Sequence, residues 1–353
     1  MPNVLSIFSG GGGIDCGFKS AGFSIAMSTD NWEPACETLE KNKVGKLVVC
    51  KDIREINYDE ELAKIGMKKS DIDVLVGGPP CPAYSKMRYY QKDKGIALAD
   101  ENSFTLYEYM RALEEIQPKV FMFENVYGFV YKPAKAAFDL LMDTARENGY
   151  IVNYKVINAA NYGVPQKRER FICVGVKAEH GEKFEFPAET HHDPKKATAD
   201  NENLLPWVTA GDAIGDLDYW TPDDTGVIPG SKYNHLLKEV PPGDNYLYFT
   251  EKKGYPNPIF KWRSRYWSFL LKLSPDEPSW TIQASFSNNQ GPFHWKSRHL
   301  RIPEIKRLQT FDDNYEICGN FYDKWRQVGN AVPPRLVEQI AKAIKEQYFK
   351  EEE

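Results

Sequence analysis

The sequence predicts an α/β protein with a large sheet domain and a second, smaller and irregular domain. Short apolar strands alternate with amphipathic helices from residue 4 to residue 176, a pattern typical of α/β domains. The composition changes near Pro187, and from there to about Trp295 the chain is rich in proline, tryptophan and polar turns. The length of 353 residues fits roughly two to three domains, or one large domain with an insertion.

The composition indicates a globular protein, with 42% hydrophobic and 27% charged residues. No apolar run approaches the roughly 20 residues of a membrane helix. No signal-peptide pattern precedes the first strand, so we expect a cytoplasmic protein. The six cysteines form no CxxC pair, which argues against a metal site or a disulfide framework. His191 and His192 follow a polar stretch and are expected to be solvated.

A glycine turn follows the first predicted strand. The strand covers Val4 to Phe8, the turn Ser9 to Gly13, and the next helix Ile14 to Ala21. This order is typical of nucleotide-cofactor sites, where glycines let a cofactor approach the backbone at a helix N-terminus. The dinucleotide spacing GxGxxG fits in no register, which argues against a pyrophosphate. A cofactor with a nucleoside but no phosphates remains open.

Acidic residues stand at the next two strand ends. The strand from Phe23 to Ser28 leads to Asp30, and the strand from Lys46 to Cys50 leads to Asp52-Ile53. A carboxylate at the second strand end can accept hydrogen bonds from both ribose hydroxyls.

Cys81 follows another strand directly. The apolar segment from Val74 to Val76 runs through Gly77-Gly78-Pro79-Pro80 into this cysteine, which places Cys81 at a sheet rim, where open α/β sheets carry their chemistry. A lone cysteine in a turn is more often a packing residue, so its role stays open at this point. The polar loop from Ala83 to Asn102 has the length of a functional lid.

Glu124 comes directly after the apolar strand from Val120 to Phe123. Desolvation there would raise the pKa of the carboxyl group and let it donate a proton near neutrality; alternatively, Glu124 caps the next turn. Arg168 and Arg170 are two residues apart on an extended segment and point to one face. Paired guanidiniums can hold an anion, a carbonyl or a carboxylate.

The segment from Glu251 to Thr310 is locally basic, with eleven basic and four acidic residues among interleaved aromatics, although the whole chain carries a net charge of -5. This composition suits phosphates and bases, but a solvated face over an aromatic core would look the same. The remaining predicted elements are the helices Thr105 to Ile116, Ala134 to Asn148, Ala210 to Leu217, Glu304 to Thr310 and Arg335 to Tyr348, and the strands Val152 to Asn158 and Phe171 to Val176.

Taken in order, six motifs resemble those of the DNA cytosine-C5 methyltransferase family. They are FSGGGGIDCGFKSAGF from Phe8, VGGPPCPAYS around Cys81, FENV ending at Val126, NYGVPQKRERF ending at Phe171, RLQTF from Arg307 and QVGNAVP from Gln327. The resemblance covers nearly the whole chain, except roughly Pro187 to Arg298. It implies a Rossmann-like, S-adenosylmethionine-dependent methyltransferase fold with a mixed, mostly parallel sheet.

The resemblance also implies a mechanism, because C5 of cytosine is a poor nucleophile until a thiolate adds at C6. Cys81 would be that nucleophile, Glu124 would hydrogen-bond or protonate N3, and Arg170, supported by Arg168, would hold O2. The base that removes the C5 proton before β-elimination is not identified, and a water is an option.

The cofactor implied is S-adenosylmethionine, without a metal. Its expected contacts are Phe8, Ser9, Gly10, Gly11, Gly13, Asp30, Asn31, Asp52, Ile53, Pro80, Asn330 and Ala331. Three features differ from the family pattern. Pro82 follows the cysteine where Gln is commonest, Thr105 stands where an apolar residue often lies over the adenine, and RLQTFDD lacks the usual proline before its acidic pair.

The substrate implied is double-stranded DNA with a flipped cytosine, closed over by Ala83 to Gly95. Expected DNA contacts are Ser85, Lys86, Arg88 and Thr281. The predicted division is a catalytic domain (1–186), a target-recognition domain (187–298) that reads the major groove, and a returning segment (299–353).

We expect a monomeric modification methylase of a restriction-modification or self-protection system, with any cognate endonuclease acting separately. Two alternatives stay open. One is an RNA methyltransferase of the same fold, although the Cys-Phe-Thr signature of the tRNA-modifying branch is absent. The other is a non-catalytic DNA-binding homologue, which would be expected to lose Cys81, Glu124 or Arg170.

Overall fold

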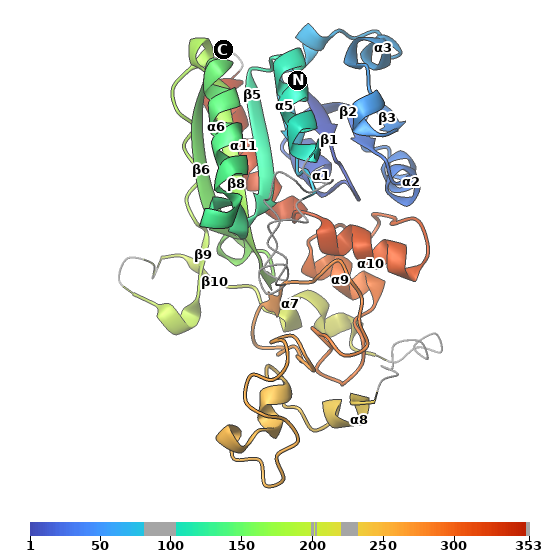
Figure 1. Cartoon of the computed structure of the whole chain (residues 1–353), viewed down its shortest axis with the longest axis vertical. Helices are drawn as coiled ribbons and strands as arrows, with labels where there is room; N and C mark the ends of the chain where they lie inside the picture. The colour runs from blue at the N-terminus through green and yellow to red at the C-terminus, as the bar shows by residue number, and fades with distance from the viewer. Residues whose placement is uncertain (81–103, 199–200, 202, 220–231, 351–353) are drawn as a thin grey trace.

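The computed structural model describes residues 1–80, 104–198, 201, 203–219 and 232–350. These residues form an upper lobe around one large sheet and a lower lobe of short helices and irregular segments (Figure 1). Among the described residues, no helix is both long and apolar enough to cross a membrane.

The upper sheet has seven strands in the order β3-β2-β1-β4-β5-β8-β6. Their bounds are β1 Asn3–Ile7, β2 Ser24–Asp30, β3 Leu47–Cys50, β4 Val74–Gly77, β5 Val120–Val126, β6 Tyr150–Asn158 and β8 Glu169–Lys177. β8 is the strand of this sheet that runs opposite to the other six, and it pairs antiparallel with both β5 and β6. The predicted mixed, mostly parallel sheet is therefore confirmed.

The described α-helices surround this sheet and reach into the lower lobe. They are α1 Gly13–Ser20, α2 Glu33–Lys41, α3 Tyr58–Ala63, α5 Phe104–Ile116, α6 Lys135–Glu147, α7 Ala210–Ile214, α8 Asn234–Leu237, α9 Ile302–Leu308, α10 Phe321–Asn330 and α11 Pro334–Tyr348.

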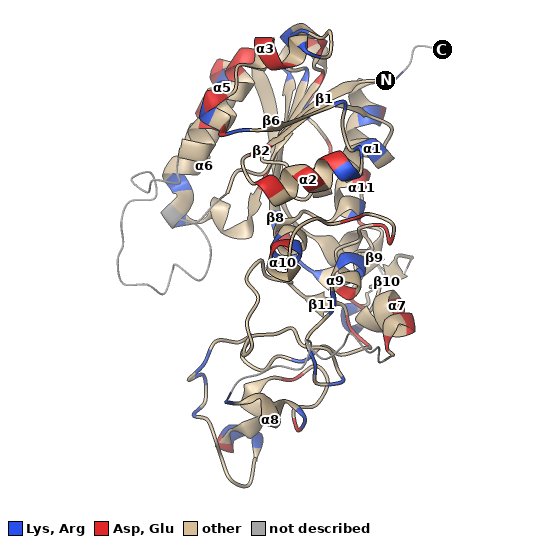
Figure 2. Cartoon of the chain, turned by 90° about the vertical axis from the view of Figure 1, so that its right-hand side faces the viewer, with Lys and Arg blue, Asp and Glu red and all other residues tan. Residues whose placement is uncertain are grey.

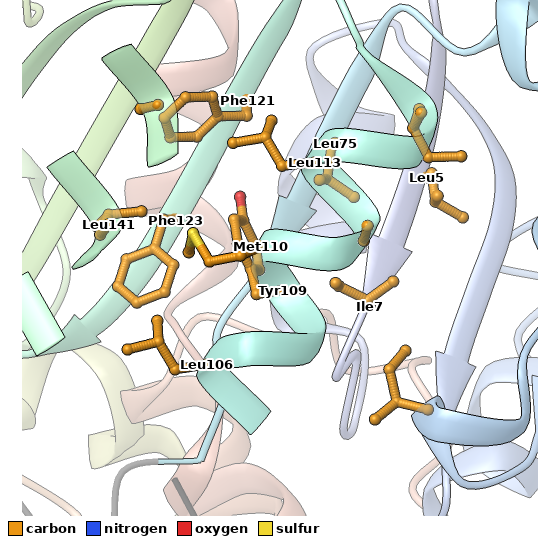
Figure 3. Packing of buried hydrophobic residues seen from close by; sticks show 14 of the residues in the cluster. Leu5, Ile7, Leu75, Leu106, Tyr109, Met110, Leu113, Phe121, Phe123 and Leu141 are labelled. Atoms are coloured by element: carbon orange, nitrogen blue, oxygen red, sulfur yellow. The ribbon is translucent and has the colours of Figure 1, made fainter. Parts of the chain in front are cut away.

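Both faces of the sheet are buried, because strand side chains alternate between two hydrophobic clusters. Phe121 and Phe123 of β5 join the cluster under α5 and α6 (Figure 3). Val120 and Met122 of the same strand join the opposite cluster, which α1 and α11 cover. This double burial explains why the strands appear as continuous apolar runs in the sequence.

The predicted strands and long helices are present with ends shifted by a few residues, whereas α2, α3, α8 and α10 were missed. For α10 the reason is specific: Gly329 and Asn330 belong to the QVGNAVP motif, which we placed before the last helix and in no helix of its own. They are the last two residues of α10, which begins with a capping box between Asn320 and Asp323. The predicted terminal helix is confirmed as α11.

Two small sheets lie outside the large one. β9 (His191–His192) pairs with β10 (Leu205–Pro206), and β7 (Gln166–Lys167) pairs with β11 (Ser279–Trp280). The prediction that His191 is solvated was wrong, since the residue is only 6% exposed. Burial lowers the pKa of His191, and Thr190 Oγ1 lies 2.8 Å from its Nδ1.

The lower lobe has a small aromatic core of its own, which includes Tyr246, Phe249, Phe260 and Phe269. A separate cluster joins the two lobes by packing Leu39 of α2 with Ile282 and Leu308.

Candidate active site at the carboxyl edge of the sheet

Four adjacent parallel strands, β2, β1, β4 and β5, bring their carboxyl ends to one edge of the sheet. The glycine turn follows β1, Asp30 ends β2, Gly78 follows β4, and Glu124 lies near the end of β5. Residues separated by more than a hundred positions in the sequence therefore share one edge, as expected for ligand sites in open α/β sheets.

The glycine turn is tied to Asp30. The Gly10 backbone N–H donates to Asp30 Oδ2 at 2.8 Å, and the Trp32 N–H donates to Oδ1 at 3.0 Å. Burial raises the pKa of Asp30. A Cβ on Gly10 would meet no atom within 4 Å, so the turn is open on that side.

The other side of the turn is closed by the C-terminal part of the chain. A Cβ on Gly11 would lie 3.2 Å from Gln327 Cβ, and one on Gly13 would lie 2.3 Å from the Val332 carbonyl oxygen and 3.0 Å from Ala331 Cβ. The fold thus brings Ala331, one of the predicted cofactor contacts, against the turn.

The end of β3 contributes a carboxylate that is already paired. Arg54 donates from Nε to Asp52 Oδ1 at 2.9 Å and from Nη2 to Oδ2 at 2.6 Å. These hydrogen bonds lower the pKa of Asp52 to about 2. The Arg54 guanidinium also lies 4.5 Å from the ring centroid of Phe104. Ile53 is buried in the cluster on which Phe8 packs.

Glu124 and Arg170 form an ion pair with 2.9 Å between Oε1 and Nε, and their side chains are only 11% and 12% exposed. Burial raises the pKa of Glu124, although Arg170 and Arg168 lower it. A Cβ on Gly78 would lie 2.6 Å from Glu124 Oε2, so the segment leading to Cys81 touches this carboxylate.

Arg168 is buried and binds backbone carbonyls. Its Nη1 donates to Ile282 O at 3.0 Å, and its Nη2 donates to Gly329 O at 2.8 Å and to Asn330 O at 3.3 Å. The predicted paired guanidiniums thus take two of the partners we considered: Arg170 holds a carboxylate, and Arg168 holds carbonyls.

The segment after β4 is anchored by two side chains. Asn125 Nδ2 donates to Pro79 O at 3.3 Å, and Thr105 Oγ1 donates to Pro80 O at 3.2 Å. Thr105 is buried, and its hydroxyl fixes the approach to the predicted nucleophile. Cys81 and Pro82 lie outside the described residues, as do Ser85, Lys86 and Arg88.

The remaining predicted residues lie in several places. Ser9 Oγ hydrogen-bonds the Ser6 carbonyl at 3.2 Å, and Asn31 and Asn330 are exposed. Thr281 donates its hydroxyl to Lys167 O at 2.7 Å, which fixes it beside the arginine motif.

Several residues at the site were missed by sequence reasoning. Gln327 receives a hydrogen bond from Thr38 Oγ1 at 2.6 Å and touches Gly11, and Tyr315 donates its hydroxyl to Gly11 O at 2.9 Å. The position of Gln327 at the start of the QVGNAVP motif was a usable signal. For Tyr315 and Arg54 we find none.

The sheet topology, with this site at its edge, is that of a Rossmann-like methyltransferase. Solved structures support the fold: a prophage-encoded E. coli protein described as a DNA modification methyltransferase aligns with a TM-score of 0.69 at 20% identity, covering 99% of this chain and 100% of that one. The S. pombe Dnmt2 methyltransferase aligns with a TM-score of 0.64 at 16% identity, covering 98% of each chain.

The sequence comparisons define the family. The model of the C-5 cytosine-specific DNA methylases matches residues 2–346. The type II methyltransferase M.SacI of Streptomyces achromogenes is 37% identical over 98% of this chain and 93% of its own. M.NgoFVII of Neisseria gonorrhoeae is 34% identical over 97% of this chain and 86% of its own. The chain belongs to the C-5 cytosine-specific DNA methylase family and is a DNA (cytosine-5-)-methyltransferase, as the motifs predicted.

Proposed function

We propose that the chain methylates C5 of cytosine in double-stranded DNA with S-adenosylmethionine, as the modification enzyme of a type II restriction-modification system. The observation that carries the mechanism is the buried Glu124–Arg170 pair, which touches the Gly78 segment leading into Cys81. The names of the type II relatives support the biological role.

In this proposal side chains of the protein activate the cytosine ring. The Cys81 thiolate adds to C6 of a cytosine flipped out of the duplex. Glu124 then donates a proton or hydrogen bond to N3 while Arg170 holds O2, so the charge that develops on the ring is neutralised. Removal of the C5 proton and β-elimination return Cys81 to its free form.

The residues at the glycine turn fit a nucleoside cofactor without phosphates. The turn is open beside Gly10, and the Asp30 carboxylate lies 2.8 Å from the Gly10 backbone nitrogen. Each Asp30 oxygen retains a lone pair for a ribose hydroxyl. Ile53 and Phe8 would contact the adenine, and Ala331 would close the pocket. The bound cofactor supplies an electrophilic methyl group.

The lower lobe offers an exposed segment that is both basic and aromatic for DNA. All seven residues of Lys261–Trp267 are exposed, and the segment contains three basic and three aromatic side chains. Several other basic residues of the lower lobe are paired internally; Arg298, for example, is 2% exposed and forms a bidentate pair with Glu304. Figure 2 shows basic residues along the outer loops of this lobe. We therefore assign the phosphate and base contacts to Lys261–Trp267.

Two experiments test the proposal. DNA from cells that express the protein is treated with bisulfite and sequenced, and we expect protected cytosines within one short sequence motif. The purified enzyme is also incubated with duplexes that carry 5-fluorocytosine in that motif. Because fluorine cannot leave as a proton does, we expect a covalent complex that survives denaturation and is absent with Cys81→Ser. Methylation without any trapped complex would exclude the attack by Cys81.

A further inference from the structure

A chain of buried amides connects the two lobes behind the active site. Gln166 of β7 and Gln309, which caps α9, are both fully buried. Gln166 Nε2 donates to Gln309 Oε1 at 2.5 Å, and Gln309 Nε2 donates to the Ala331 carbonyl. At the other end, Gln166 Oε1 accepts from the Ile282 backbone N–H at 3.2 Å. We call these two glutamines the amide relay.

The relay has one self-consistent polarity. Its first partner, the Ile282 N–H, can only donate, and its last partner, the Ala331 carbonyl, can only accept. Both glutamine amides are therefore oriented in one direction, and turning either of them would place two donors or two acceptors against each other. Since neither side chain reaches solvent, water cannot replace a lost partner.

The two ends of the relay lie at functionally different places. Ile282 follows Thr281 in the lower lobe and also holds Arg168 through its carbonyl. Ala331 lies against Gly13 in the glycine turn. A displacement of the 281–282 segment relative to β7 must therefore either break a buried hydrogen bond or move Gln309 together with Ala331.

From this geometry we infer that Gln166 and Gln309 are positioning residues that couple duplex binding in the lower lobe to cofactor binding at the glycine turn. The inference rests on the proposed function, since it takes DNA and S-adenosylmethionine as the two ligands. Coupling between two sites is reciprocal and typically amounts to a factor of about 5 to 150 in affinity.

The test is a titration of the full-length enzyme with S-adenosylhomocysteine, a cofactor product that cannot be turned over. The dissociation constant is measured alone and with saturating unmethylated genomic DNA, which contains any short recognition site. For the wild type we expect DNA to tighten binding at least about fivefold. For Gln309→Met, which retains side-chain volume, we expect this ratio to fall to about one while the affinity without DNA changes less than about threefold.

Two further variants separate coupling from general loss of structure. Gln309→Glu keeps an acceptor for Gln166, and in its ionised form it places a second acceptor oxygen against the Ala331 carbonyl in place of the amide donor, so it should also lose the coupling. Tyr150→Phe removes a buried hydrogen bond to the carbonyl of Pro118, which precedes β5 at the sheet edge opposite the active site, and it should keep the wild-type ratio.

Each outcome decides the inference. A wild-type ratio below about two, or an unchanged ratio in both Gln309 variants, would overturn it. A loss of coupling in Tyr150→Phe as large as in Gln309→Met would also overturn it, because a general loosening of the fold would then suffice. Failure of the proposed function is distinguishable, since the wild-type enzyme would then protect no cytosine from bisulfite.

Discussion

Arg170 and Glu124 face each other across antiparallel strands β8 and β5, with Nε and Oε1 2.9 Å apart. In the strand register Arg170 is paired with Val126, so its side chain reaches back diagonally to Glu124. Burial lowers the pKa of Arg170 and raises the pKa of Glu124. The pair therefore holds a carboxyl group that protonates more readily than an exposed glutamate.

The first prediction concerns catalysis by this pair. Arg170→Lys loses the fixed guanidinium that orients Glu124, so kcat should fall by about 10² to 10³, with the duplex dissociation constant changed less than about threefold. Transfer of labelled methyl groups and a filter-binding assay measure the two quantities. A kcat within threefold of wild type would contradict the assigned role.

The second prediction concerns pH. If protonated Glu124 acts on N3, kcat is highest below the raised pKa of Glu124 and falls as the pH rises through it. Glu124→Gln cannot ionise, so its residual rate should lack this decline. The dependence of kcat on pH is measured for the wild type and for Glu124→Gln over a chosen range of about pH 5 to 9. If Glu124→Gln shows the same decline, the decline belongs to the titration of another group.

The third prediction concerns Gly78. A Cβ at this position would lie 2.6 Å from Glu124 Oε2, so Gly78→Ala must displace the carboxylate or the segment before Cys81. Displacements of about 1 Å at reacting groups can cost about 100-fold in rate. We expect kcat to fall by about that factor with a small change in melting temperature. Gly215→Ala, where a Cβ would meet no atom within 4 Å, is the matched control.

The fourth prediction concerns stability and pH. Burial raises the pKa of Asp15 from 3.8 to about 6, although Ser28 and Ser6 donate hydrogen bonds to it. Between these two values the native state binds more protons than the unfolded state, so this group lowers stability as the pH rises from about 4 to about 6. Above about pH 6 the full loss of stability persists. At roughly 1.4 kcal/mol per pKa unit, this loss amounts to about 3 kcal/mol.

Asp15→Asn removes this titration while keeping polar atoms beside both serines. We therefore expect the free energy of unfolding of the variant to exceed that of the wild type at pH 8, with the difference shrinking toward pH 4. Urea denaturation at both pH values measures it. A difference independent of pH would mean that Asp15 has an ordinary pKa in the folded state.

The fifth prediction concerns DNA binding. If Lys261 and Arg263 contact phosphates, replacing either one with alanine should lower the slope of log K against log salt by about 0.9. The matched control is Arg146→Ala on α6, whose side chain is 75% exposed and which should leave the slope unchanged. Equal slopes for all variants would place the DNA contacts elsewhere.

The sequence by itself determined the family and the sheet strands, and it predicted the reacting groups. Glycine turns, acidic strand ends and apolar runs are local signals, because each follows from the backbone requirements of a few neighbouring residues. For the same reason Glu124 could be assigned to a strand end, and its raised pKa was expected from desolvation.

The tertiary structure decided which of these groups are paired, and with what. Arg168 and Arg170 look equivalent in the sequence, yet Arg170 meets a carboxylate while Arg168 binds carbonyls of Ile282, Gly329 and Asn330. Likewise, Arg298 and the exposed Arg263 count equally toward a basic segment, but of these two only Arg298 is paired with Glu304. Such differences depend on contacts between residues far apart in the chain, and the local pattern around each arginine does not contain them.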